Sequence, residues 1–116
     1  MKRNLLLSLA LSPLFTSCDG SVRARGSIED TSHKPVAGAT VRLIGSKYTF
    51  SAKTNALGEF EVHGTVGPGH HNYDVHIEAP TFKSVAGQVP TLKDNQLTAI
   101  LAPTAGTEVS VIRVLP

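Results

Sequence analysis

Cysteine, tryptophan and helical periodicity are scarce or absent in this chain of 116 residues. It has one cysteine, no tryptophan, four phenylalanines and two tyrosines. A single cysteine cannot form a disulfide within the chain, so no internal cross-link stabilises the fold. No segment after Cys18 repeats apolar residues at helical spacing over three turns, which argues against a helical domain.

Two common hydrolase motifs are absent as well. The chain contains neither a Gly-x-Ser-x-Gly nucleophile motif nor a His-Glu-x-x-His zinc motif. The sequence therefore predicts neither a catalytic residue nor a cofactor.

The first 17 residues have the order of a secretory signal. Lys2 and Arg3 precede an apolar run from Leu5 to Phe15, which corresponds to a positive region followed by a hydrophobic region. The run is shorter than the roughly 20 apolar residues that a membrane-spanning helix needs. It also contains Pro13. We expect residues 1–17 to be a signal peptide; the alternative is a buried helix.

Cys18 follows the sequence Leu-Phe-Thr-Ser, which resembles the lipobox of bacterial lipoproteins. In that motif a small residue, here Ser17, precedes a cysteine that is lipidated and becomes the mature N-terminus, although Phe15 stands where an aliphatic residue is usual. The resemblance implies a lipid anchor at Cys18, a short tether over residues 18–21 and a place in the bacterial cell envelope, facing the periplasm. Asp19 resembles a signal for retention in the inner membrane. The alternative is an ordinary signal peptide with an unpaired cysteine.

The positive net charge belongs to the signal segment. Without Lys2 and Arg3, the mature chain keeps 9 of its 11 basic side chains, against 9 acidic ones. It has no cluster of lysine and arginine that would form the electrostatic footprint of a nucleic-acid-binding protein. We therefore exclude nucleic acid as a partner.

After Cys18, apolar and polar residues alternate in short runs separated by turn residues, as in half-buried strands. About 100 residues suit one domain, and seven or eight short strands predict an all-β, antiparallel, immunoglobulin-like sandwich. The alternating runs are Val22 to Ile28, Ala39 to Leu43, Phe50 to Thr54, Phe60 to Val62, Tyr73 to Ile77, Val85 to Val89, Leu97 to Leu101, and Val109 to Val114 as an edge strand.

Glycine, proline and asparagine mark the expected turns. In the stretch Thr-Asn-Ala-Leu-Gly-Glu-Phe (54–60), Asn55 and Gly58 are expected to take the positive backbone angles of a tight connection between two strands. Gly38 is expected to bend the chain into the second strand, and Pro68 with Gly69 to reverse it before Tyr73.

Three segments together resemble the carboxypeptidase regulatory-like domain, a member of the transthyretin-like (prealbumin-like) sandwich group. They are PVAGATVRL (35–43), TNALGEFEV (54–62) and GPGHHNYDVHIEAPTFKS (67–84). The resemblance covers residues 22–103 and leaves 104–116 as a C-terminal extension. One departure is Thr81-Phe82, where the family frequently has Gly-Tyr after its Ala-Pro pair.

The resemblance implies a non-catalytic accessory module. Hydroxyisourate hydrolases of the transthyretin-like group have a site of histidine and arginine completed by a C-terminal Tyr-Arg-Gly-Ser, whereas this chain ends in VSVIRVLP. We therefore expect a structural or protein-interaction module whose partner is another membrane-proximal envelope protein.

A metal site is an alternative. His63, His70, His71 and His76 lie within 14 residues, and neutral imidazole binds zinc and copper. If the strands around residues 61 and 75 were antiparallel neighbours, His63 would face Asp74. Transthyretin-like topology would instead place these strands in different sheets and leave the histidines as solvated surface groups.

Carbohydrate binding is a further alternative. Related sandwich modules stack sugars on aromatic side chains, and the aromatic residues available for such a platform are Tyr48, Phe50 and Phe82. A flat stacking surface usually draws on tryptophan or several tyrosines, so the sequence favours this function only weakly.

Replacing Cys18 with Ala is predicted to release the protein from membranes into the soluble fraction. Each CH₂ of an acyl chain contributes about 0.8 kcal/mol of membrane affinity, so several chains anchor a protein essentially permanently. The measurement is membrane partitioning together with labelling by a clickable fatty acid. Unchanged partitioning without labelling of the wild type would contradict the assignment.

Overall fold

A computed structural model describes residues 20–116, which form eight β-strands and no helix. No helix in this part of the chain is long and apolar enough to cross a membrane. The strands are β1 (Gly20–Asp30), β2 (Thr40–Ile44), β3 (Thr49–Lys53), β4 (Glu59–Val66), β5 (Asn72–Glu78), β6 (Val85–Pro90), β7 (Asp94–Leu101) and β8 (Val111–Val114).

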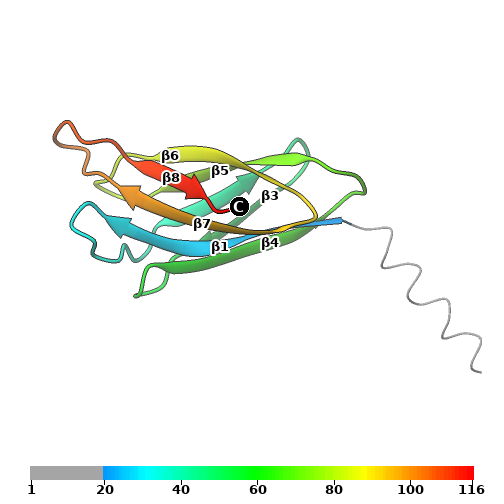
Figure 1. Ribbon diagram of the computed structural model, residues 1–116, viewed down its shortest axis with the longest axis horizontal. Coiled ribbons are helices and arrows are strands. Elements are labelled where there is room, and N and C mark those ends of the chain that lie inside the picture. The colour runs from blue at the N-terminus through cyan, green and yellow to red at the C-terminus, as the bar shows by residue number, and fades with distance from the viewer. Residues whose placement is uncertain (1–19) are drawn as a thin grey trace, which may run out of the picture.

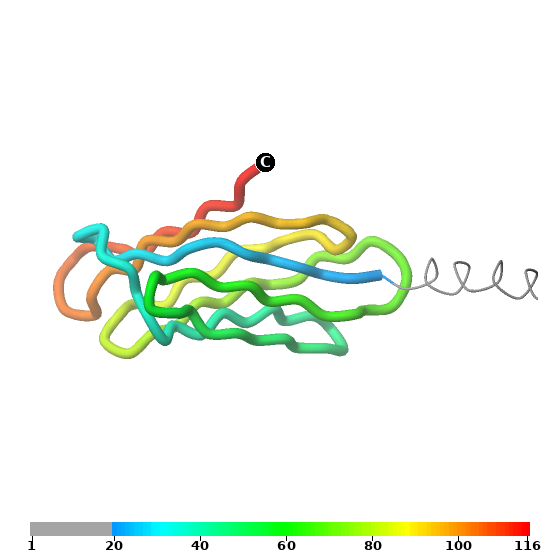
Figure 2. Tube along the Cα trace, turned by 90° about the horizontal axis from the view of Figure 1, so that it is seen from below, coloured from blue at the N-terminus to red at the C-terminus, as the bar shows by residue number. Residues whose placement is uncertain are grey.

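The strands form two four-stranded sheets that pack face to face (Figure 1). The first sheet has the order β4-β1-β7-β8, which Figure 2 shows side by side from the green to the red trace, and the second has the order β3-β2-β5-β6. The predicted all-β sandwich is confirmed. One pair departs from the antiparallel expectation, because β1 and β7 run parallel. The chain between β1 and β7 forms β4 and all four strands of the second sheet. Such a long connection permits two strands of one sheet to pair in parallel.

The core lies between the sheets and consists of the inward residues of the alternating runs. Val22, Val41, Val75 and Leu97 are at most 1% exposed. Burial of such side chains stabilises the fold by roughly 1.5–3 kcal/mol each. Among the described residues, the buried members of this cluster run from Val22 to Leu101, and Ile112 of β8 packs against them.

β1 begins two residues earlier than the sequence predicts. Gly20 and Ser21 pair with the last residues of β4, and Ser21 O accepts a hydrogen bond from Leu92 N at 2.8 Å. Gly20 and Ser21 therefore belong to the sandwich and not to the predicted tether. The remaining tether residues, Cys18 and Asp19, lie outside the described part of the chain.

β4 is longer than the predicted run from Phe60 to Val62. It continues through Gly64 to Val66 because eight consecutive residues pair with β1. A glycine such as Gly64 usually weakens the interior of a strand. Here it is required, because a Cβ at this position would overlap the ring of Phe50. The glycine therefore makes room for an aromatic side chain from the other sheet.

The stretch from Thr54 to Phe60 is a turn between β3 and β4. Gly58 has a φ of 76° and donates a hydrogen bond to Asn55 O at 2.9 Å. Asn55 has no positive φ, contrary to the expectation. Its side-chain Oδ1 instead accepts hydrogen bonds from the amides of Leu57 and Glu59, at 2.9 and 3.0 Å. Asn55 thus shapes the turn through its side chain.

The other two expected turns contain glycines with positive φ. Gly38 has a φ of 76° and donates a hydrogen bond to Thr54 O at 3.1 Å, which joins two loops at one end of the sandwich. Gly69 has a φ of 99°. The adjacent carbonyl of Pro68 lies 3.2 Å from His71 Nε2.

Thr81 has a φ of 69°, in the left-handed region that favours glycine. It occupies the position where the resemblance leads one to expect glycine. Its carbonyl accepts a hydrogen bond from Thr104 N at 3.0 Å, and the next residue, Phe82, packs against the core. The loop therefore keeps the backbone shape of a glycine turn with a β-branched residue, at a cost of roughly 1–2 kcal/mol.

The C-terminal segment belongs to the fold. β8 pairs antiparallel with β7 and forms an edge of the first sheet. The strand begins at Val111, two residues after the predicted start at Val109. The C-terminus then lies near the middle of the molecule in Figure 1.

Gly58→Ala is predicted to destabilise the protein more than Gly38→Ala, although both glycines have a φ of 76°. A Cβ at Gly58 would lie 2.5 Å from Ile28 O, whereas a Cβ at Gly38 would meet nothing within 4 Å. We expect a loss of about 1 kcal/mol of unfolding free energy at Gly38 from backbone strain alone, and of about 2–4 kcal/mol at Gly58. Chemical denaturation measures both, and equal losses would refute the assigned packing of the turn.

Thr81→Gly is predicted to raise the free energy of unfolding by about 1 kcal/mol, because relief of the left-handed strain exceeds the entropy cost of glycine. Thr81→Ala is the matched control and should gain less than half as much, since it removes only the β-branch. A lower denaturation midpoint for Thr81→Gly would show that the loop is not strained.

Candidate functional site

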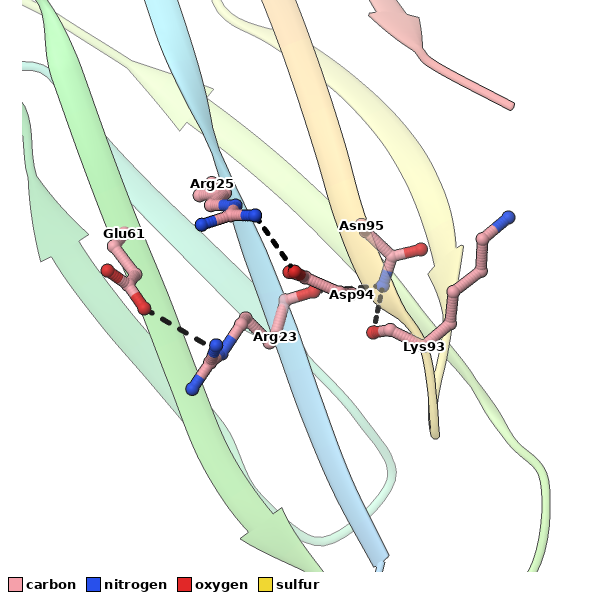
Figure 3. A network of polar contacts seen from close by, with 6 residues as sticks. All are labelled: Arg23, Arg25, Glu61, Lys93, Asp94 and Asn95. Carbon is pink, nitrogen blue, oxygen red and sulfur yellow. Dashed lines mark hydrogen bonds and ion pairs between the residues drawn. The ribbon is translucent and has the colours of Figure 1, made fainter.

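The outer face of the first sheet is charged, and two ion pairs lie on it. Arg23 Nε lies 3.7 Å from Glu61 Oε2, and Arg25 Nη2 lies 3.0 Å from Asp94 Oδ2 (Figure 3). All four side chains are about half exposed, so each pair contributes at most about 1 kcal/mol. A shallow hollow of about 720 Å³ lies beside Arg25, with Lys53 and Glu59 also on its lining. Both signs of charge line this hollow, so it does not favour an ion of one sign.

The outer face of the second sheet is arranged similarly. Arg42 Nη1 donates to Glu78 Oε1 at 2.8 Å, and Gln88 Nε2 donates to Asp74 Oδ1 at 3.1 Å. His76 lies between these two pairs on β5, directly opposite Arg42 of β2. The face is a polar surface with one ion pair and one further hydrogen bond between side chains.

The four histidines of the metal alternative are not brought together. His63 lies on the outer face of the first sheet, opposite Arg23, while His76 lies on the outer face of the second. His70 and His71 lie in the loop between these strands. The pairing of His63 with Asp74 does not form, because β4 and β5 belong to different sheets. Within residues 20–116, no group of three or more His, Cys, Asp or Glu could hold a metal ion.

The aromatic residues form a row at one end of the sandwich. The rings of Tyr48 and Phe50 are 6.2 Å apart and those of Phe50 and Tyr73 are 6.3 Å apart, both nearly parallel. Burial, with a smaller effect from Tyr48, raises the pKa of Tyr73 above its ordinary value. Phe50 and Phe82 pack against the core, so of the three residues considered for sugar stacking only Tyr48 is an exposed large side chain. The row is not a flat platform.

Asn95 is a buried polar residue that the sequence reading did not single out. Its Nδ2 donates to Arg23 O and Pro90 O, both at 2.9 Å, and to Lys93 O at 3.2 Å (Figure 3). Its Oδ1 has no hydrogen-bond partner within the described residues. The residue ties the start of β7 to β1. The sequence did contain a sign that Asn95 is buried. Asn95 lies two residues before Leu97 and so falls on the inward face of the same alternating run.

Exposed aliphatic side chains gather along the edge strand β8. Ile100 and Val111 are a cross-strand pair on the outer face, Val109 precedes the strand and Val114 ends it. Their exposed fractions are 38%, 49%, 69% and 38%. We call these four residues the apolar edge. The only charged residue of β8 is Arg113.

The sequence model of the carboxypeptidase regulatory-like domain family matches residues 23–112. The resemblance seen in the sequence is therefore confirmed, and the match extends into β8. No curated protein sequence matches this chain.

Two solved structures share the fold. The 5-hydroxyisourate hydrolase of Klebsiella pneumoniae superposes with a TM-score of 0.62 and 17% identity, covering 81% of this chain and 99% of that one. The 3-chlorocatechol 1,2-dioxygenase of Rhodococcus opacus 1CP superposes with a TM-score of 0.54 and 10% identity, over 73% of this chain and 61% of that one. At such identities the likeness concerns the fold alone. With the family model matched across nearly all of both sheets, the chain belongs to the carboxypeptidase regulatory-like domain family.

Proposed function

We propose that this protein is a membrane-anchored lipoprotein of the bacterial cell envelope whose sandwich is a non-catalytic protein-interaction module. Its lipid anchor is Cys18, and the domain faces the periplasm; Asp19 favours the inner membrane. Support for a non-catalytic role comes from the regulatory-like family and from the outer faces, on which Arg23, Arg25 and Arg42 are each paired with a carboxylate.

The apolar edge carries the proposal. Within residues 20–116, β8 pairs with β7 on one side only, and no strand pairs with the backbone N–H and C=O groups of its other side. Natural edge strands are usually protected by charge, proline or a covering segment. Here Val109 and Val111 are instead exposed, and Arg113 is the one charge on the strand. An extended segment of a partner can add to such an edge, with backbone hydrogen bonds supplying affinity and the aliphatic side chains supplying specificity.

The fold sets the height of the apolar edge above the membrane. β7 begins at Asp94, at the same end of the sandwich as the start of β1, and Val111 pairs with Ile100 six residues further along β7. Ile100 in turn lies opposite Glu29, nine residues beyond Gly20, and Val114 lies level with Gly26, six residues beyond Gly20. At about 3.3 Å per residue, the apolar edge therefore lies roughly 20–30 Å from the end where the anchor attaches. A partner must reach this height, which favours a membrane protein with a periplasmic segment or another anchored domain.

Site-specific photo-crosslinking in cells tests the proposal. A photoreactive residue at Val109 should yield an adduct with one membrane-proximal envelope protein. The matched control is Leu57, which is 68% exposed against 69% for Val109 but lies in the turn between β3 and β4. Leu57 should not give the same adduct. Val111→Glu should abolish the adduct at Val109 without moving the denaturation midpoint, because Val111 is half exposed.

An adduct of equal yield from both positions, or one that persists in Val111→Glu, would refute a partner site at the apolar edge. An adduct between two copies of this chain would show self-association through β8 and would likewise overturn the proposal of a separate partner.

A further inference from the structure

The end of the sandwich at which β1 begins is formed by three loops. They are residues 45–48, 67–71 and 91–93, which we call the anchor end (Figure 1). Hydrogen bonds join two of the loops to each other and to β1: Thr91 N donates to His71 O, and Leu92 N donates to Ser21 O, both at 2.8 Å. Residues of loops 45–48 and 67–71 line one hollow, so all three loops form a connected surface beside Gly20, the first residue after the tether.

The anchor end carries positive charge without carboxylates. Lys47 and Lys93 are exposed, and neither forms an ion pair within residues 20–116. The three loops contain no aspartate or glutamate. Asp94, which follows the third loop, is paired with Arg25 at 3.0 Å. Asp19 precedes this end in the sequence and lies outside the described residues. The two ammonium groups are thus available to an external anion.

Each of the two lysines is next in the sequence to a large apolar or amphipathic side chain, and each of these two pairs lines a hollow. Lys47 and Tyr48 line a hollow of about 380 Å³, and Leu92 and Lys93 line another of about 480 Å³. Tyr48 and Leu92 are each 46% exposed. Lysine and tyrosine place an apolar body and a polar tip at a boundary between water and a less polar phase.

Leu92 is held in an unfavourable conformation. Its φ of 63° lies in the left-handed region, which costs a branched residue free energy. In this conformation its amide donates a hydrogen bond to Ser21 O. Strained residues that persist at a surface often mark functional sites. Here the strained residue presents a half-exposed leucine beside Gly20.

We propose that the anchor end is a docking surface for the anionic phospholipid headgroups of the membrane that holds the protein. The inference rests on the proposed lipid anchor at Cys18. Only Asp19 separates Cys18 from Gly20, so the Cα atoms of Cys18 and Gly20 can be at most about 7 Å apart. Lys47 and Lys93 supply the complementary charge, and Tyr48 and Leu92 supply contacts at the level of the headgroups.

The magnitude of the interaction suits an anchored protein and not a free one. A lysine near an anionic membrane surface contributes about five-fold in affinity, so two lysines contribute about 25-fold. This is too little to recruit a protein from solution. A lipid anchor makes docking an intramolecular step with a high effective concentration of lipid. Under that condition, a 25-fold preference for the docked state is enough to orient the domain.

Docking is tested on a domain anchored chemically, independently of lipidation in cells. Residues 18–116 include all eight strands of both described sheets, and Cys18 is the only thiol of the chain, so it can be coupled to a maleimide phospholipid in nanodiscs. Spin-labelled headgroups then broaden the amide signals of the surface that faces the lipid. In discs with phosphatidylglycerol, amides of 46–48 and 91–93 should broaden more than amides of 32–38 at the opposite end.

The double variant Lys47→Gln, Lys93→Gln should lower the ratio of docked to undocked domain by about 25-fold. The matched control Lys34→Gln, Lys53→Gln removes the same charge from the opposite end and should leave the ratio unchanged. Discs of phosphatidylcholine alone should behave like the Lys47, Lys93 variant. Equal broadening at both ends, or a preference that survives the double variant, would overturn the docking surface. Failure of lipidation in cells would overturn the proposed anchor and leave this measurement unaffected.

Discussion

The parallel pairing of β1 with β7 is the constraint on which the arrangement of this domain depends. β1 lies between β4 and β7, and a Cβ at Gly26 would overlap the carbonyl of Leu97, so the two backbones can approach only because this residue is glycine. Buried Asn95 fixes the same pair at its start through its hydrogen bond to Arg23 O. The pairing places β8 at one edge of the first sheet and the loop 91–93 beside the start of β1.

The positions of β8 and of loop 91–93 place the apolar edge and the anchor end on different parts of the molecule. The anchor end gathers lysines without carboxylates, while the ion pairs of Arg23 and Arg25 neutralise the broad outer face of the first sheet. The apolar edge extends from the pair of Ile100 and Val111, at the far part of β7, to Val114 opposite Leu97. The two surfaces to which we assign lipid docking and protein binding therefore do not overlap, and docking as proposed would leave the edge strand accessible.

The sequence predicted the alternation of inward and outward residues because strand periodicity is a local property of the chain. It did not predict the pairing of β1 with β7 or the extension of β4 past Gly64, since both depend on contacts between distant residues. The histidines illustrate the same limit. His63 and His76 point outward as their periodicity indicates, but the assignment of their strands to different sheets separates them. Leu92 gave no local signal, because its positive φ accompanies a hydrogen bond to Ser21, a residue distant in the sequence.

The height of the edge strand above the bilayer tests most directly whether the domain is held upright with its edge exposed. It can be measured by energy transfer from a single fluorophore to acceptor lipids on the anchored protein, with the fluorophore at position 46 of the anchor end or at position 111 of β8. An upright domain predicts that position 111 lies about 20–30 Å farther from the lipid surface than position 46. Equal heights for the two positions would contradict it, because the sandwich would then lie flat or tumble freely on its anchor.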